Sequence, residues 1–452
     1  MPSASRAAAA GASCTLRSKS TLPKSGTWID RELGYNTCVP TDRTRTQAAA
    51  SICQSITRAA ACGSRASRRK LVHAAIDPDP ISGAILTPIY QSTTYIQDSI
   101  EQYLEKGYSY SRTNNPTVST LERKIAMLEG GYGSACFGTG MAATIAVVSG
   151  TMKAGDHCVI TNCSYGGTNR VCRTMFTDMG MQFDFVDFTD VATIAKYIKP
   201  NTKLIFSESP ANPTLTLTDI PAVSALAKKH GIPHVVDSTF ATPIIQRPIE
   251  LGADLVIQST TKFYDGHNMT VGGAVICATK ELYERIKHMQ NVHGNIMSPQ
   301  NAFYTLQTTK TLALRVKQQS TTAMKIAKFL EKHPAVETVR YPGLDSHPQK
   351  ELADRQHLDG VHGSMLWFEV KGGTESGRAM MNSIQRPWSL CENLGAAESI
   401  CTAPAVMTHA NMLKEDRLKV GITDGFVRIS CGLEDADDLI ASLKQSLDAL
   451  RR

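Results

Sequence analysis

Long hydrophobic runs are missing from this sequence. No stretch of about 18 apolar residues, the length that spans a bilayer as a helix, occurs in its 452 residues. The chain is therefore not expected to cross a membrane. Hydrophobic residues make up 42% and charged residues 20% of it, which is typical of a soluble globular protein.

Paired cysteines are also missing. The twelve cysteines include no C-x-x-C pair, which argues against a disulfide framework and favours the reduced thiols of an intracellular protein. The histidines are scattered, and the spacing His230-x-x-x-His234 runs through Gly231 and Pro233 instead of along a helix. No metal site is expected from this pattern.

Acidic residues are scarce only near the N-terminus. Residues 1–70 hold twelve Lys and Arg against three acids, whereas the remaining residues hold 36 against 38. The body of the chain thus has no basic excess that would attract nucleic acid. Residues 1–70 are rich in Ala, Ser and Arg and lack a hydrophobic period, so we expect a disordered extension. An organelle transit peptide is the alternative, and without one the protein is expected to be cytoplasmic.

Helix and strand patterns alternate through the body of the chain. Leu121, Ile125 and Leu128 repeat on one helical face, and Gly130 ends that helix. Short apolar runs that are typical of buried strands follow at 158–160, 183–186, 203–206, 234–237 and 254–257. This alternation predicts an α/β fold with a mostly parallel sheet between helices. Beyond about residue 315, long helices and separated strands predict a smaller α+β domain.

Three candidate residues follow predicted strands: Glu208, Asp237 and Lys262. Ligands of open α/β sheets collect at the carboxyl ends of strands. An amine must be neutral to attack an aldehyde, so Lys262 requires a desolvated or electropositive setting. The hydroxyls of Ser259 and Thr261 can bond a phosphate beside it. Asp237 follows an apolar run and is expected to be partly buried beside a cation such as a protonated pyridine nitrogen, unless it simply caps the next turn.

A glycine-rich loop, Gly138-Thr139-Gly140-Met141, introduces a helix. Its small residues let backbone N–H groups approach an anion at the positive end of that helix. The stretch also matches the dinucleotide pattern G-x-G-x-x-A. Against that interpretation, we expect no full strand in the six residues before the loop, and the next acid, Asp156, comes too early. A phosphate site is favoured.

Two arginines stand out for different reasons. Arg428 lies within an apolar strand pattern, where a guanidinium needs an anion, and an amino-acid carboxylate is a natural bidentate partner. Arg112 pairs with Tyr110 on a predicted loop, which by itself is typical of a surface.

Taken together, these motifs resemble the trans-sulfuration (Cys/Met metabolism) family of enzymes that depend on pyridoxal 5'-phosphate, over about residues 71–450. The motifs in chain order are Tyr110-Ser111-Arg112, Asn115-Pro116-Thr117, Gly138-Thr139-Gly140-Met141, Tyr165-Gly166-Gly167-Thr168, Glu208-Ser209-Pro210-Ala211-Asn212-Pro213, Asp237-Ser238-Thr239, Ser259-Thr260-Thr261-Lys262 and the stretch from Val427 to Asp435. The resemblance implies the type I fold of such enzymes, an α/β architecture with a seven-stranded, mostly parallel sheet. It also implies four parts: the extension 1–70, an arm 71–130 that contacts a neighbouring subunit, a cofactor-binding large domain 131–315 and a small domain 316–452.

The resemblance further implies residue roles. Lys262 would carry the cofactor covalently and later move protons, and Tyr165 would stack on its ring. The remaining cofactor contacts would come from Asp237, Thr239, Gly140, Met141, Ser259 and Thr261, with Tyr110 and Arg112 arriving from a neighbouring subunit. The substrate contacts would come from Arg428, Asn212, Glu392, Asn393 and Arg170. A homotetramer built as a dimer of dimers with shared active sites is thereby implied.

Within the family, the stretch 165–170 is most similar to that of cystathionine γ-lyases. Such enzymes cleave L-cystathionine to L-cysteine, 2-oxobutanoate and ammonia, and side reactions release hydrogen sulfide. Glu392 is expected to be buried beside the cofactor and to face the distal amino group of cystathionine. Ser238, Asn393 and the pair 269–270 depart from the family pattern, so γ-synthase and β-lyase activities stay open. A nucleotide-dependent oxidoreductase and a catalytically silent binding protein are the remote alternatives.

Overall fold

The structure is a computed structural model of the whole chain, and it describes residues 28–29, 36–37, 68–407, 414–419 and 421–450. The chain divides into two compact units, residues 1–65 and 66–452. In the first unit, the strands β1 (Trp28–Ile29) and β2 (Asn36–Thr37) pair antiparallel. The rest of the predicted extension up to residue 67 lies outside the described residues. Its expected end at residue 70 falls inside helix α2 (Arg68–His73).

Helix α3 (Pro116–Glu129) begins and ends where the sequence predicts. The side chain of Asn115 accepts the N–H groups of Thr117 and Val118, and proline takes the first helical position. At the other end Gly130 has a φ of 77°, the left-handed conformation that favours glycine.

The predicted seven-stranded, mostly parallel sheet is confirmed, with the strand order β3-β9-β8-β7-β6-β4-β5. The strands are β3 (Gly133–Phe137), β4 (His157–Thr161), β5 (Gln182–Val186), β6 (Thr202–Glu208), β7 (His234–Asp237), β8 (Leu255–Gln258) and β9 (Gly273–Cys277). The strands β5, β4, β6, β7 and β8 pair in parallel, and β9 runs antiparallel to β3 and β8.

Strand β3 corrects one expectation. It occupies residues 133–137, directly before the glycine-rich loop at Gly138, so the expectation that no full strand precedes this loop is wrong. Its sequence has no β-branched residue and is rich in small ones, which weakens a strand pattern. Tertiary packing makes the strand instead, because Ala135, Cys136 and Phe137 are completely buried.

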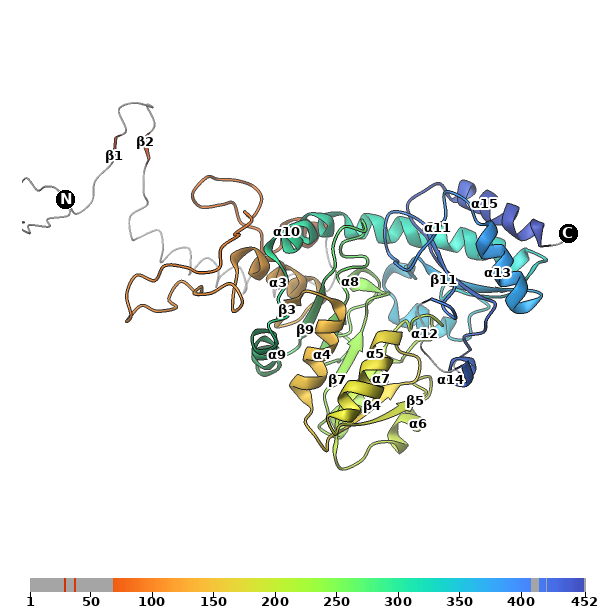
Figure 1. Cartoon of the computed structure of the whole chain (residues 1–452), viewed down its shortest axis with the longest axis horizontal. Coiled ribbons are helices and arrows are strands. Elements are labelled where there is room, and N and C mark those ends of the chain that lie inside the picture. The colour runs from red at the N-terminus through yellow and green to blue at the C-terminus, as the bar shows by residue number, and fades with distance from the viewer. Residues whose placement is uncertain (1–27, 30–35, 38–67, 408–413, 420, 451–452) are drawn as a thin grey trace, which may run out of the picture. The chain divides into compact units, whose positions relative to one another are not determined.

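Helices flank the sheet (Figure 1). Along β4, Cys158 and Ile160 pack in one hydrophobic cluster with α4 (Gly140–Thr151) and α9 (Lys280–His293), whereas Val159 packs in another with α6 (Val191–Lys196) and α7 (Ile220–Lys229). This alternation is the two-residue period of a strand that is buried on both sides. The other helices of this part are α5 (Gly166–Val171), a π-helix (Cys172–Phe176), α8 (Thr242–Ile245), α10 (Pro299–Thr308) and a 3₁₀ turn (Thr309–Thr311).

A second sheet of five strands lies beyond α11 (Leu312–Lys332), in the order β10-β11-β14-β13-β12. Its strands are β10 (Val336–Arg340), β11 (Met365–Val370), β12 (Ser389–Leu390), β13 (Ile400–Thr402) and β14 (Phe426–Ser430). Its helices are α12 (Lys350–Gln356), α13 (Gly373–Ser383), α14 (Lys414–Lys419) and α15 (Ala436–Ala449), with a 3₁₀ turn at Leu358–Gly360. The borders that we expect at residues 130 and 315 stay a prediction. Throughout the described residues, every helix is too short or too polar to pass through a bilayer.

Candidate active site

The carboxyl ends of three neighbouring strands carry the predicted site residues. In the register of the sheet, Glu208 at the end of β6 lies opposite Asp237 at the end of β7, and Asp237 lies opposite Ile257 in β8. Lys262 follows β8 in a turn that is closed by hydrogen bonds from its own N–H to the Ser259 carbonyl and from the Gly266 N–H to its carbonyl, at 3.2 and 2.7 Å. Parallel strands thus bring Lys262, Asp237 and Glu208 to one edge of the sheet.

The amine of Lys262 is held in place by one hydrogen bond. Its Nζ donates to Oδ1 of Asn393 at 2.7 Å, across 131 residues of sequence. Burial, and next the positive charge of Arg428, lower the pKa of Lys262 from 10.5 to about 8, while the carboxylate of Glu392 acts in the opposite direction. An amine with this pKa can both take up and give up protons near neutral pH.

Asp237 and Glu208 form a pair of buried carboxyl groups. Oδ1 of Asp237 accepts the Thr239 N–H at 3.0 Å, so this residue does cap the next turn as the simpler interpretation held. Burial raises the pKa of Asp237, and burial followed by the charge of Asp237 raises the pKa of Glu208. A cation beside Asp237 would lower both pKa values and remove this cost.

Glu208 also positions two segments of the site. Its Oε2 accepts the N–H of Tyr165 and its Oε1 accepts the N–H of Asn212, both at 2.8 Å. Tyr165 is 40% exposed, and its ring lies beside Met141, because a Cβ added to Gly167 would come within 2.6 Å of Tyr165 Cε1 and 2.7 Å of Met141 Sδ.

The glycine-rich loop meets the turn before Lys262. A Cβ added to Gly140 would lie 3.0 Å from Cβ and Oγ of Ser259, so only glycine lets the start of α4 approach this closely. Thr139 caps α4 by accepting the Ala142 N–H at 2.9 Å. The first N–H groups of a helix lack acceptors within it and attract anions. Thr261, which is also expected here, instead exchanges hydrogen bonds with the carbonyl and N–H of Gly272.

Arg428 lies in the middle of β14 and is only 1% exposed. Its Nη1 donates to Oδ1 of Asn212 at 2.7 Å, and its Nη2 donates to Oγ1 of Thr402 at 3.3 Å. Within the described residues no carboxylate forms an ion pair with it, although the charge of Glu392 acts on its pKa. Burial lowers that pKa from 12.5 to about 10. Such a guanidinium is a ready partner for a substrate carboxylate.

A model of the Cys/Met metabolism PLP-dependent enzyme family matches residues 68–448. The chain belongs to this family. It is 43% identical to a cystathionine γ-lyase of Bacillus subtilis over 84% of this chain and 98% of that protein. It is 42% identical to a cystathionine β-lyase of Coxiella burnetii over 84% of this chain and 97% of that protein.

Solved structures give the same family. A cystathionine γ-synthase from Xanthomonas oryzae pv. oryzae, in complex with aminoacrylate and cysteine, matches with a TM-score of 0.83 and 37% identity over 86% of this chain and 99% of that one. The type I fold and the dependence on pyridoxal 5'-phosphate that the sequence predicts are thereby confirmed. The three relatives carry three different activities, so similarity alone leaves the reaction of this family member open.

The residues of the site fit pyridoxal phosphate. An aldehyde requires an amine such as Lys262, a protonated pyridine nitrogen requires a buried carboxylate such as Asp237, and a phosphate requires the positive end of a helix such as α4. The close approach of Gly140 to Ser259 forms the narrow site that the phosphate needs.

Several predicted residues make no hydrogen bond to this group within the described residues. Arg170 is exposed on α5. Nη1 of Arg112 donates to the carbonyl and the Oδ1 of Asn291 at 2.9 and 2.6 Å, and Tyr110 is 46% exposed. Glu392 is exposed in the single chain, although its charge acts on the pKa values of Lys262 and Arg428, so its burial beside the cofactor stays a prediction. It lies in the connection between β12 and β13, at the surface of this chain.

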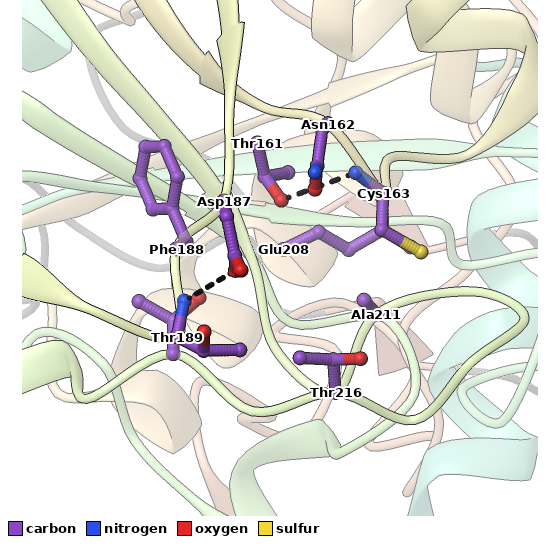
Figure 2. Close-up of a pocket in the computed structure, with 10 residues that line it drawn as sticks. Thr161, Asn162, Cys163, Asp187, Phe188, Thr189, Glu208, Ala211 and Thr216 are labelled. Carbon is purple, nitrogen blue, oxygen red and sulfur yellow. Dashed lines mark hydrogen bonds between the residues drawn. The ribbon is translucent and has the colours of Figure 1, made fainter. Parts of the chain in front are cut away.

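Sequence reasoning missed two features. Asn268 and Glu398 join the group through Asn393, and neither carries a motif that marks it as functional. A cavity of about 160 Å³ also opens at the carboxyl ends of β4, β5 and β6 (Figure 2). Its lining consists of Thr161, Asn162, Cys163, Asp187, Phe188, Thr189, Glu208, Ala211, Thr216 and Thr218. Because these residues come from separate segments, only the fold reveals the cavity.

Proposed function

We propose that this chain cleaves L-cystathionine to L-cysteine, 2-oxobutanoate and ammonia. The observation that carries the proposal is the position of one amine: Lys262 Nζ lies 2.7 Å from Asn393 Oδ1, the residue is half-buried, and its pKa is lowered by burial and next by the charge of Arg428. An amine base beside a guanidinium that can hold a carboxylate suits proton abstraction from an amino acid.

The site offers a residue for each part of the cofactor. In this proposal Lys262 would bind the cofactor aldehyde, and Asp237, whose turn Thr239 stabilises, would pair with the ring nitrogen. Tyr165 would stack on the ring. Gly140 and Met141 at the start of α4 would hold the phosphate with Ser259, and Thr261 would join them by releasing its bond to Gly272. When bound, the cofactor supplies an electron sink for the substrate carbanion.

In this proposal Lys262 acts as the general base and general acid. Its Nζ would take the α-proton of the bound amino acid and later release it. The neutral amine would then take a proton from the β-carbon and pass it to the departing γ-sulfur, which leaves as the thiol of cysteine. A pKa of about 8 for Lys262 leaves part of the amine neutral at physiological pH, so that it can act as a base.

Substrate recognition uses opposite charges at the two ends of cystathionine. Arg428 and Asn212, which are already hydrogen-bonded to each other at 2.7 Å, would hold the α-carboxylate. Glu392 would face the distal ammonium, because its negative charge acts on both Lys262 and Arg428. Asn393 would contact the reacting part of the substrate, and Arg170 would lie at the entrance.

A homotetramer with shared active sites is part of the proposal. The segment before α3 exposes several large apolar side chains, with Ile81 93%, Ile96 89% and Ile100 90% exposed. An apolar surface of this kind favours burial against another copy of the chain. Tyr110, which is exposed, and Arg112, which is bonded to Asn291, would reach the phosphate of a neighbour.

A β-lyase is the second candidate. The β-lyase relative is 42% identical, against 43% for the γ-lyase relative, and Asn393 stands where the family commonly has serine. Product analysis with purified protein separates the two: cysteine and 2-oxobutanoate support the proposal, whereas homocysteine and pyruvate indicate β-cleavage. Cystathionine made from cysteine and an O-acyl- or O-phosphohomoserine would indicate a γ-synthase.

The cofactor link has its own test. A yellow preparation that absorbs near about 420 nm and is bleached by borohydride supports an imine on lysine. Lys262→Ala should abolish both the bleaching and the turnover. Hydrogen sulfide released from cysteine would be the expected side reaction.

A further inference from the structure

Three amide and carboxylate side chains extend from Lys262 in a line of hydrogen bonds. Lys262 Nζ donates to Asn393 Oδ1 at 2.7 Å, Asn393 Nδ2 donates to Asn268 Oδ1 at 2.5 Å, and Asn268 Nδ2 donates to Glu398 Oε2 at 2.9 Å. We propose that Asn268 and Glu398 are positioning residues that set the direction of this line and so keep the Lys262 amine a donor toward Asn393. The inference deepens the proposed function and rests on it for its catalytic meaning.

The direction of the line is fixed at its far end. An amide can present either its oxygen or its nitrogen to a neighbour, but an ionised carboxylate only accepts hydrogen bonds. Glu398 therefore requires the nitrogen of Asn268, which leaves the oxygen of Asn268 for Asn393. Asn393 must then turn its own nitrogen to Asn268 and its oxygen to Lys262.

Both segments that carry the line are held by the fold. Asn268 has a φ of 55°, and its turn is bonded to the buried carboxylate of Asp265, which accepts the N–H groups of His267 and Met269 at 3.1 and 3.0 Å. The segment with Asn393 and Glu398 is joined to this turn by the Ala397 N–H, which donates to the Gly266 carbonyl at 2.9 Å. The side chains thus meet in a fixed frame.

The consequence concerns the lone pair of the lysine. A neutral amine that donates one hydrogen to Asn393 keeps its lone pair free for the substrate proton. If the Asn393 amide turned around, its NH₂ group would donate a hydrogen bond to that lone pair. This bond would stabilise the neutral amine, but it would also occupy the lone pair that must accept the substrate proton. The line matters in the state in which Lys262 carries no covalent partner, which is when it acts as a base.

Two substitutions at Asn268 separate direction from mere contact. Asn268→Gly suits the positive φ and removes the amide, so Asn393 is free to turn and the pKa of Lys262 should fall by about half to one unit, the size of one hydrogen bond. Asn268→Asp also tolerates this φ and places a carboxyl against that of Glu398; the two share one proton, and the oxygen that faces Asn393 still accepts from it. It should therefore restore the direction, and the pKa of Lys262 should stay at or above that of the unaltered chain.

Glu398→Gln tests the far end. A neutral amide at 398 permits both directions and removes the negative charge at the far end of the line, so the pKa of Lys262 should fall by about half a unit. Glu337→Gln is the matched control, since it removes an exposed carboxylate from β10, outside the line.

The measurement for all these variants is the rate at which acetic anhydride modifies Lys262 in the cofactor-free full chain, followed by mass spectrometry across a range of pH.

The outcomes distinguish the two proposals. The positioning role is overturned if Asn268→Gly leaves the pKa of Lys262 obtained from labelling unchanged. It is also overturned if Asn268→Asp lowers this pKa as much as Asn268→Gly does. Circular dichroism of each variant guards against loss of the fold. If labelling follows the expected order while cystathionine stays intact, the proposed substrate fails and the positioning role stands.

Discussion

Replacing Arg428 with methionine should stabilise the cofactor-free protein and at the same time remove substrate binding. Arg428 is a buried cation in the middle of β14 with hydrogen bonds to Asn212 and Thr402 but no ion pair within the described residues. A buried charge without an opposite charge beside it reduces the stability of the fold. Such a charge is typical of a site that binds a ligand of opposite charge.

The magnitude follows from the effect of burial. The pKa of Arg428 falls from 12.5 to about 10, which corresponds to about 3 kcal/mol by which folding disfavours the charged form. Because the folded pKa is lower than the unfolded one, this cost is present in full below pH 10 and disappears as the pH rises further. The lost hydrogen bonds to Asn212 and Thr402 offset about 2 kcal/mol. Arg428→Met should therefore gain about 1 kcal/mol.

The assay combines melting curves with kinetics. Glycine, which offers an α-carboxylate, should raise the melting temperature of the unaltered protein and leave that of Arg428→Met unchanged. The value of kcat/KM for cystathionine should fall about 10²- to 10³-fold, mostly through KM, because a charge-assisted pair is worth several kcal/mol. Arg428→Lys keeps the charge without the planar fork, so it should bind weakly and gain no stability.

The reasoning is refuted by one pattern. If Arg428→Met melts at a lower temperature than the unaltered protein and KM is unchanged, then Arg428 serves the fold and the carboxylate site lies elsewhere.

Three further predictions concern the cofactor and the base. Gly140→Ala should weaken pyridoxal phosphate binding about tenfold in a titration, because a Cβ there has neighbours at 3.0 Å, whereas Gly150→Ala on the same helix should leave it unchanged. The carboxylate of Glu392 raises the pKa of Lys262, so Glu392→Gln should lower it, and the rising limb of kcat against pH should move to lower pH by about half a unit; movement to higher pH would contradict this. Asp237→Asn should lower kcat on the order of 10²- to 10³-fold while cofactor absorbance remains, and full activity in this variant would show that the ring nitrogen has another partner.

Local sequence predicted the elements with clear end signals. Helix α3 carries a capping asparagine, a first-turn proline and a terminal glycine, and each of these acts within a few residues. Strands β4 and β6 to β8 could be predicted because their short apolar runs are almost entirely buried, and the edge strand β5 could be predicted from its apolar residues Phe183, Phe185 and Val186. Strand β3 has no such pattern, since Gly133-Ser134-Ala135 would suit a turn equally well, and its pairing with β9 across 140 residues makes it a strand.

The sequence by itself determined the family and the cofactor, and it predicts the lysine that would carry the cofactor. These predictions depend on short contiguous motifs, whose residue types and spacing are typical of enzymes that use this cofactor. The tertiary structure alone decided that Arg428 has no ion pair within the described residues, that Glu392 is exposed, and that Asn268 and Glu398 extend the line from Lys262. Each bond of that line joins residues 125 to 131 positions apart. No short-range preference of the chain encodes such a contact, because it exists only once two separate sheets have folded and brought their loops together.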